Sequence, residues 1–254
     1  MIEPRSRTTR KNESFRMPDT TSQKPDLIAP DHVIENRKLG KEYLMLACAD
    51  GTPWKLVGCD LEGVDATGLN FENWIFESCN VKEAKFTRAR LEYTRWTRCR
   101  GGKTKFTKAD FSDGRVEGCD FSNSDFREAT LSDSVFERCK LLGADFSMAK
   151  MLHVRFAETI LMAARLPPMS FRKQRINGVN FDAADLSGCD FRDVTFDDCI
   201  LRNANLKGAK FAGADIQRAD IGDIGITAAK VFKGAFISLE QASRLVQGLG
   251  LTVV

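Results

Sequence analysis

The sequence predicts an all-β solenoid with a helix at each end. Three observations predict it: a biased aromatic composition, an apolar period of five residues, and a small residue at a fixed place before each apolar one. The chain has 254 residues, with 18 phenylalanines against 2 tyrosines and 3 tryptophans. This bias indicates one buried slot, used repeatedly, that has no room for a polar tip.

The apolar period covers most of the chain. From Leu56 to Phe236, every fifth residue is apolar except Gly101, and these 37 positions hold sixteen of the phenylalanines. A small residue, mostly alanine or cysteine, stands two positions before most of these centres, and Asp or Asn often lies between the two. Neither a helix nor a strand produces this spacing, since their side-chain periods are 3.6 and 2 residues.

Units such as AlaAspPhe at 109–111 and AlaAspLeu at 184–186 resemble the pentapeptide-repeat family, and the resemblance covers residues 54–236. It implies a right-handed parallel β-helix of square cross-section, with one unit per side, four units per coil, and the centre and small residue pointing inward. The 37 units then make about nine coils. At the spacing of parallel strands these coils stack into a rod about 40–45 Å long. Because backbone pairing runs between coils, each coil needs its neighbours.

Both ends of such a rod need caps. Residues 1–30 are polar and are predicted to form a disordered tail, with a secretion signal as the alternative interpretation. Residues 31–53 form the predicted N-terminal cap, with a helix over 31–47 that begins at Asp31. We expect this helix to cover the first coil with Tyr43, Leu44 and Leu46.

Residues 237–254 are predicted to form a C-terminal helix and tail. Ser238 and Gln241 make a capping box. The stretch GAFISLEQASRLVQGLGLTVV is similar to the C-terminal segment of the quinolone-resistance and gyrase-inhibitor members of the family, which implies that the segment pairs two solenoids into a homodimer. A monomer in which the helix only caps the rod is the alternative. The predicted interface consists of the apolar stripe Leu239, Ala242, Leu245, Val246 and Leu249.

Seven of the eight cysteines occupy the small inward position. Five of them, from Cys59 to Cys139, recur at every fourth unit, which is once per coil, so we expect them to stack. We interpret them as small buried apolar residues, since a metal site or redox relay would need a CxxC pair or a supporting histidine. Cys48 lies outside the solenoid. We therefore expect neither a cofactor nor a metal site.

The charge is nearly balanced overall and uneven along the chain. The net charge is +3, but residues 82–115 hold 11 basic and 4 acidic residues, whereas residues 176–226 hold 5 and 9. A basic patch of this kind is either a docking surface for an acidic partner or membrane, or ordinary solubility charge. The interaction candidates that a shift of one coil places on one side are Lys85, Arg88, Lys103, Lys105 and Lys108.

A second candidate surface is the stretch 163–175, where Pro167 and Pro168 interrupt the consensus but the five-residue phase continues. Proline cannot donate a ladder hydrogen bond. Either the coil is distorted here, or a loop projects from it. The basic residues that would decorate such a loop are Arg165, Arg172, Lys173 and Arg175.

The sequence offers no catalytic constellation, and we expect a non-enzymatic scaffold that binds another protein through its charged faces. One alternative is a DNA-mimicking modulator of DNA gyrase or topoisomerase, which needs an acidic stripe. Residues 52–236 carry 28 basic and 26 acidic residues, and the local acidic patch is Asp190, Asp193, Asp197 and Asp198. Another alternative is a secreted bacterial effector.

Composition also restricts the compartment and the partners. No apolar run is long enough to span a bilayer, and the N-terminus lacks the apolar stretch of a Sec signal. We expect a cytoplasmic bacterial protein with reduced cysteines, while export by another route stays open. The balanced charge makes direct nucleic-acid binding an unexpected activity.

Overall fold

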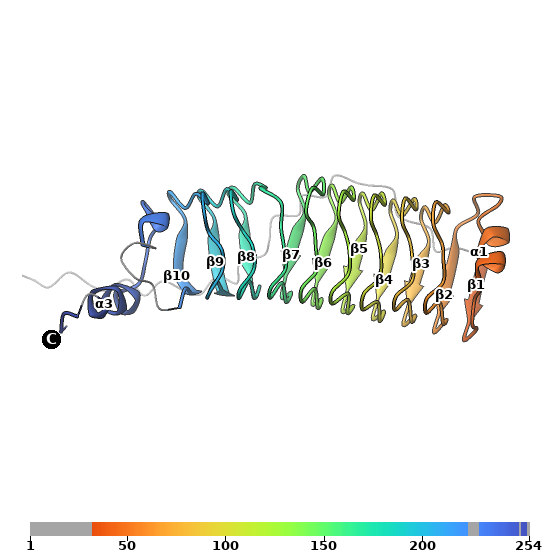
Figure 1. Ribbon diagram of the computed structural model, residues 1–254, viewed down its shortest axis with the longest axis horizontal. Coiled ribbons are helices and arrows are strands. Elements are labelled where there is room, and N and C mark those ends of the chain that lie inside the picture. The colour runs from red at the N-terminus through yellow and green to blue at the C-terminus, as the bar shows by residue number, and fades with distance from the viewer. Residues whose placement is uncertain (1–31, 223–228, 249, 253–254) are drawn as a thin grey trace, which may run out of the picture.

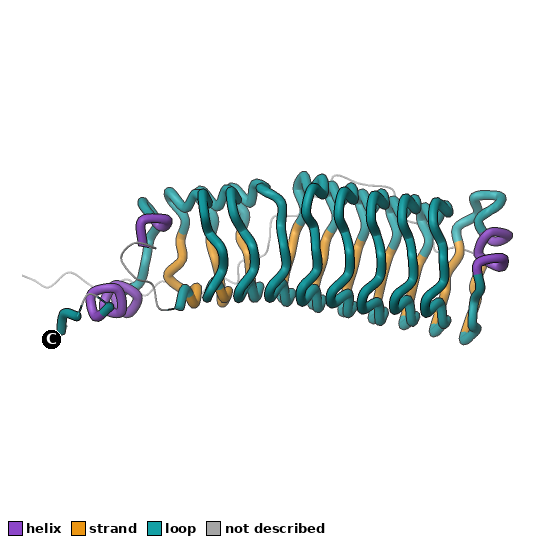
Figure 2. Tube along the Cα trace, in the orientation of Figure 1, coloured by secondary structure: helices purple, strands orange, loops and turns teal. Residues whose placement is uncertain are grey.

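The structure, a computed structural model, describes residues 32–222, 229–248 and 250–252 as a rod of stacked coils (Figures 1 and 2). It is a parallel β-solenoid of about nine turns, which confirms the predicted fold class. The predicted tail over residues 1–30 lies outside the described residues. The elements are β1 (His32–Glu35), α1 (Lys41–Ala47), β2 (Trp54–Val57), β3 (Ile75–Glu77), β4 (Arg95–Thr97), β5 (Arg115–Glu117), β6 (Val135–Glu137), β7 (Arg155–Ala157), β8 (Arg175–Asn177), β9 (Thr195–Ile200), β10 (Asp215–Asp220), the 3-10 helix η1 (Lys230–Phe232) and α3 (Leu239–Gln247).

Each coil of the rod consists of four of the repeat units. Strands β2 to β7 pair in parallel with an offset of one such coil, so that Lys55 faces Ile75 and Ile75 faces Arg95. Isolated bridges repeat the same offset on the other sides of the coil, as between Asp65 and Lys85. The longer strands gather on one side in two sheets, one formed by β1 to β7 and one by β8 to β10.

Local hydrogen bonds explain the consensus of the five-residue unit. The Asp before the centre accepts a hydrogen bond from the backbone N–H two residues later, as from Ser147 to Asp145 Oδ1 at 2.9 Å. This closes an Asx turn at the corner of the coil. The residue two after the centre has a positive φ, 55° at Arg88 for example. Such a backbone is costly outside glycine, and the coil-to-coil hydrogen bonds on either side hold it in place.

The centre residues fill the interior with stacked rings. Phe86, Phe106, Phe126 and Phe146 lie above one another, with ring centroids 5.5, 4.8 and 4.8 Å apart. Gly101 is the one centre without an apolar side chain, and the Phe121 ring of the next coil fills the space beside it. A Cβ at Gly101 would lie 2.2 Å from Cε1 of Phe121. The predicted inward phase is therefore the actual core of the protein.

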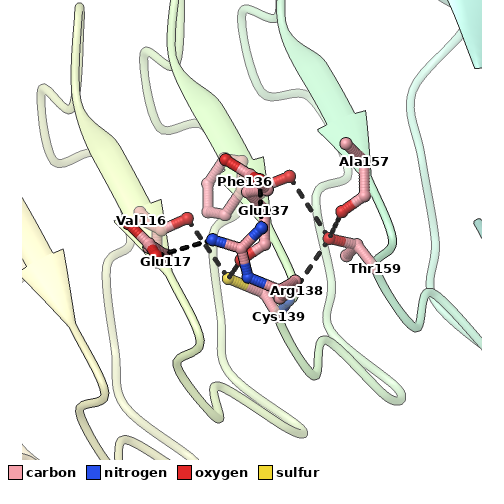
Figure 3. A network of polar contacts seen from close by, with 8 residues as sticks. All are labelled: Val116, Glu117, Phe136, Glu137, Arg138, Cys139, Ala157 and Thr159. Atoms are coloured by element: carbon pink, nitrogen blue, oxygen red, sulfur yellow. Dashed lines mark hydrogen bonds and ion pairs between the residues drawn. The ribbon is translucent and has the colours of Figure 1, made fainter. Parts of the chain in front are cut away.

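The predicted stack of five cysteines is also present, with the backbone N–H of Cys99 3.2 Å from Cys119 Sγ in the next coil. We call it the ladder; all seven inward cysteines, on this line and elsewhere, are buried free thiols. Figure 3 shows one rung: the Cys139 thiol donates to the carbonyls of Val116 and Glu137 at 3.4 and 3.2 Å. Thr159 takes the next position of the ladder and donates to Phe136 O at 3.2 Å in the same way. Cysteine therefore serves here as a small buried residue that can satisfy a carbonyl.

The N-terminal cap differs from the predicted helix over 31–47. Residues 32–35 form strand β1, which pairs with β2, and the helix α1 starts only after Gly40. The alternation around Ile34 allows this segment to add a partial coil, because the backbone of β2 would otherwise be an unpaired edge. Of the three expected covering residues, Leu44 is buried, whereas Tyr43 and Leu46 are 37% and 77% exposed.

The last coil departs from the repeat before its predicted end at Phe236. The Phe236 side chain is 59% exposed, and the out-of-phase Phe232 packs on Phe211 instead, with ring centroids 4.7 Å apart. The backbone of Phe236 pairs with Asp215, one residue beyond the regular offset of one coil. This shift turns the Phe236 ring away from the core, so the regular interior ends near Ile216.

The proline-containing stretch 163–175 forms a distorted coil and no projecting loop. Leu166, Phe171 and Ile176 remain buried in phase. The distortion breaks the backbone pairing between coils. Strands β7 and β8 do not pair, and the sheet is divided between them (Figure 1). We call this interruption, between residues 148–155 and 167–175, the seam.

Candidate interaction surfaces

The predicted basic residues of coils 82–115 lie on one side of the rod and its adjoining corners. Lys85 and Lys105 are bridge partners in adjacent coils, and the five candidate side chains are exposed. Two of them have acidic partners: Lys103 lies 3.9 Å from Glu83 and Lys108 lies 3.3 Å from Glu128. We call the remaining three, Lys85, Arg88 and Lys105, the basic face; among the described residues, none of them has an ion-pair partner.

The opposite side of the same coils carries arginines on the strands. Arg95 of β4 and Arg115 of β5 are register partners. Arg115 is partly buried, and its Nη1 donates to backbone carbonyls, the shortest contact being 2.9 Å to Asp133 O. Burial lowers the pKa of Arg115, and the charges of Arg155 and Arg95 lower it further. Like charges at one-coil spacing repel, so this side favours an anion.

The carboxylates beside these arginines are already engaged. Arg138 binds Glu117 at 2.6 Å and also contacts Glu137 (Figure 3). Arg98 binds Glu77 at 2.6 Å. These exposed ion pairs contribute little stability, but they neutralise the acids that could have balanced the arginine column.

The local acidic patch is neutralised by arginine in the structure. Asp190 binds Arg192 at 2.5 Å, and this hydrogen bond lowers the pKa of Asp190 to about 2. The carboxylates of Asp197 and Asp198 share Arg218. The remaining one, Asp193, lies 3.4 Å from Arg172. The patch therefore does not form the free acidic stripe that a DNA mimic requires.

The basic residues predicted to decorate a loop are spread over the distorted coil. Arg165 and Arg175 bind acids of neighbouring coils, Asp145 at 3.4 Å and Asp197 at 2.5 Å. Arg172 is held by Asp193, as above. Lys173 is exposed, and the described part of the chain gives it no ion pair. The structure therefore does not gather these four residues into one loop.

The C-terminal helix α3 begins with the predicted capping box of Ser238 and Gln241. Of the predicted stripe, Leu239 is 89% exposed, Ala242, Leu245 and Val246 are partly buried, and Leu249 lies outside the described residues. Sequence reasoning missed that Phe236 and Ile237 join Leu239 as exposed apolar residues. The out-of-phase exposure of Phe236 arises from the shifted register, which the repeat does not encode.

Gln241 has a second role that its sequence pattern does not reveal. Its side chain is buried, and Nε2 donates to the carbonyls of Ile216 and Ala219 at 2.8 Å each. These carbonyls belong to β10, the last strand of the solenoid. Gln241 thus caps its own helix and the end of the rod together.

No chemistry of a metal or of a reactive thiol is apparent in the described ranges. Within them, no three His, Cys, Asp or Glu side chains are placed to hold a metal ion. Cys48 is partly buried, and burial raises the pKa of its thiol to about 11. No helix among the described residues is long and apolar enough to cross a membrane.

Comparisons with known proteins agree with this geometry. Family profiles described as pentapeptide repeats match residues 55–92, 84–123, 170–203 and 189–223, and one described as a pentapeptide repeat region matches residues 109–180. No curated protein sequence matches the chain.

Solved structures that match the chain include QnrB1 and HetL. QnrB1, a plasmid-mediated fluoroquinolone resistance protein, is 19% identical with a TM-score of 0.54, and the match covers 86% of this chain and 97% of that one. HetL, involved in heterocyst differentiation regulation in the cyanobacterium Nostoc sp. strain PCC 7120, is 18% identical with a TM-score of 0.49, and the match covers 75% and 87%.

Proposed function

This chain belongs to the pentapeptide-repeat family, and we propose that it is a non-enzymatic scaffold that binds an acidic protein partner through the basic face. The observation that supports the proposal is that Lys85, Arg88 and Lys105 form no close ion pair within the described residues, although Asp65 lies one coil before Lys85, whereas many arginines are paired. Exposed unpaired cations on a rigid rod attract an acidic surface and speed its association.

The rigidity of the rod suits this role. The side chains of Lys85 and Lys105 project from consecutive coils, so their separation is set by the strand spacing of about 4.8 Å. A partner that places carboxylates at a similar spacing meets two cations that need no rearrangement of the backbone. The backbone of the rod therefore needs no ordering on binding, which lowers the cost of association.

DNA mimicry has less support. The acidic side chains that would imitate phosphates are bound to arginines, as described above for Asp190, Asp197 and Asp198. If DNA gyrase supercoiling is unchanged at a large excess of this protein, that alternative is rejected. The secreted-effector alternative rests on residues 1–30, and an export assay with and without them tests it.

We also propose that two copies pair through the C-terminal segment. The exposed apolar residues Phe236, Ile237 and Leu239 support this, because such a cluster at one end of a rod is typical of an interaction site. A two-fold pairing would join the rods end to end and leave both basic faces accessible.

The proposal for the basic face is tested by charge reversal. A Lys85→Glu, Arg88→Glu, Lys105→Glu variant is compared with the wild type in affinity capture followed by identification of the bound proteins. We expect an acidic partner to be retained by the wild type, released by added salt, and lost from the variant. The matched control is Lys140→Glu, Lys207→Glu, Lys210→Glu, which changes net charge equally on other surfaces. If the variant and the control retain the same proteins, the basic face is not the binding surface.

A further inference from the structure

The seam is a place where the backbone ladder of the solenoid is open over more than one side of a coil. In a regular coil, the corresponding N–H groups donate to backbone carbonyls of the following coil. One coil before the seam, those of Glu128, Leu131 and Asp133 do so at 3.1, 2.8 and 2.8 Å. The N–H groups of Met148, Met151 and His153 have no backbone acceptor among the described residues. On the other side of the seam, the N–H groups of Ser170 and Arg175 also have no backbone acceptor among the described residues.

The seam has definite ends. The hydrogen bond from Phe146 N to Arg165 O, at 2.8 Å, closes it on one side, and that from Glu158 N to Asn177 O, at 2.9 Å, closes it on the other. The opening therefore crosses one side of the coil and reaches the start of the strand side, where β7 and β8 fail to pair. The rod remains continuous through the residues beyond these two bonds.

Proline at position 168 accounts for the opening. Corner residues two after a centre take a positive φ, as Gly188 does one coil later with 71°. Proline is fixed near −65°, so Pro168 cannot form this corner. The N–H that it lacks would point to the following coil, as the N–H of Gly188 does, and so the lost corner rather than the lost donor explains the seam. Met169 follows in the place of a small inward residue and is 9% exposed. The larger side chain adds to the displacement of this part of the coil.

Exposed apolar side chains lie along the 148–155 side of the seam. Met148 and Leu152 are 69% and 62% exposed, at positions where most other coils have glycine or a polar or charged residue. Beside them, the buried Met151 and Phe156 retain 7% and 6% exposure, whereas most core residues are sealed to 0–1%. Open backbone groups next to apolar side chains are the two features of a sheet edge that accepts an added strand.

The charge around the seam is positive. Lys150, Arg155 and Lys173 are exposed, and the structure gives none of them an ion pair within the described ranges. Of the other charged groups nearby, Arg172 and Arg175 bind acids, and Asp133 lies 3.5 Å from His153. The exposed Glu158, at one end of the seam, forms no ion pair among the described residues. Three free cations therefore surround the exposed edge, and an acidic occupant complements them.

We propose that the seam is a docking site for an extended acidic segment of another polypeptide. Its backbone pairs with the free N–H groups of Met148, Met151 and His153. Its apolar side chains cover Met148 and Leu152, and its carboxylates lie on Lys150, Arg155 and Lys173. This site is separate from the basic face, since the two involve different coils and different residues.

The test uses a fluorescein-labelled octapeptide of alternating valine and glutamate as the probe, with the full-length protein. We expect binding by fluorescence anisotropy, and we expect the alternating valine–lysine peptide to bind at least about tenfold more weakly because its charge is reversed. Hydrogen exchange should show the amides of residues 148–155 exchanging fast in the free protein and becoming protected by the peptide. A peptide with methylated backbone nitrogens should lose this protection.

Two variants decide whether the seam is the site. Pro168→Gly with Met169→Ala restores the regular corner, so we expect slower amide exchange over residues 148–155 and loss of peptide binding. Lys150→Glu, Arg155→Glu, Lys173→Glu leaves the seam open and should weaken binding by about tenfold or more. The control Lys140→Glu, Lys207→Glu, Lys210→Glu should bind the peptide as the wild type does.

If the wild type does not bind the acidic peptide, or if both seam variants bind it as well as the wild type does, the proposal is wrong. The basic-face variant should retain peptide binding, which separates this proposal from the proposed function.

Discussion

At the scale of single residues, burial decides the behaviour of the inward cysteines. Desolvation raises the pKa of the Cys139, Cys189 and Cys199 thiols to about 11. Their carbonyl contacts, such as Cys199 Sγ to Ile176 O at 3.4 Å, require the protonated thiol as donor. These thiols are therefore unreactive at neutral pH, and the folded state is stable only while they stay protonated.

We predict that the protein loses stability in alkaline solution. The thiol pKa is higher in the folded state, so the unfolded chain ionises first as the pH rises. Stability is then intact below about pH 9 and falls toward pH 11, by about 1.4 kcal/mol per pH unit for each such thiol. Urea unfolding at pH 8 and 10.5 measures this. Cys139→Ala, which keeps a small inward residue, should show a shallower fall, and an identical fall would contradict the assignment.

Gly101 shows how a deviation from the repeat is absorbed by a neighbour. We predict that Gly101→Val, although closer to the apolar consensus, destabilises the fold by about 1–3 kcal/mol because its side chain collides with the Phe121 ring. Denaturant unfolding checks this. Gly102→Ala is the control, since a Cβ there would meet Ser122 O at an ordinary 3.7 Å. Equal stabilities for the two variants would mean that the Phe121 ring moves freely.

At the scale of elements, the ends of the rod depend on contacts that a repeat cannot provide. Strand β1 covers the edge of β2, and helix α3 is fastened to β10 through Gln241. The two caps solve the same problem, an open row of backbone groups, by different means: one adds a strand and the other uses a side-chain amide.

We predict that Gln241→Met loosens the C-terminal end. The variant loses both donations to β10, and buried carbonyls left without partners cost about 1–3 kcal/mol each. Amide exchange should accelerate over Asp215–Asp220 while β3 to β6 remain protected. Gln247→Met, at the exposed end of the same helix, is the control. Unchanged exchange in β10 would show that α3 is not a cap.

At the scale of the whole molecule, the rod is a rigid support with different chemistry along its length. Its basic face lies in coils near the N-terminal cap, the seam lies past the middle, and the exposed apolar residues lie at the α3 end (Figure 1). Since the solenoid couples each coil mainly to its neighbours, these surfaces can change independently.

We predict that Phe236→Asp with Leu239→Asp yields a monomer, because both side chains are exposed and a charge would be buried on pairing. Light scattering measures the mass. The control Met45→Asp with Leu46→Asp places charges on exposed apolar positions of α1 and should leave the mass unchanged. A wild type with the mass of one chain would contradict the proposed homodimer.

The sequence by itself determined the period, the inward residues and the capping box at Ser238, while its resemblance to the family implied the coil of four units. These follow from a local rule repeated many times, so single exceptions such as Gly101 do not obscure it. Only the tertiary structure decided which charges stay free, because long side chains reach acids in the adjacent coil, as Arg175 reaches Asp197. It also decided that Pro168 opens a seam where a loop was the alternative. The preserved phase shows only that the core continues, whereas the hydrogen bonds missing across the seam depend on how two coils face each other.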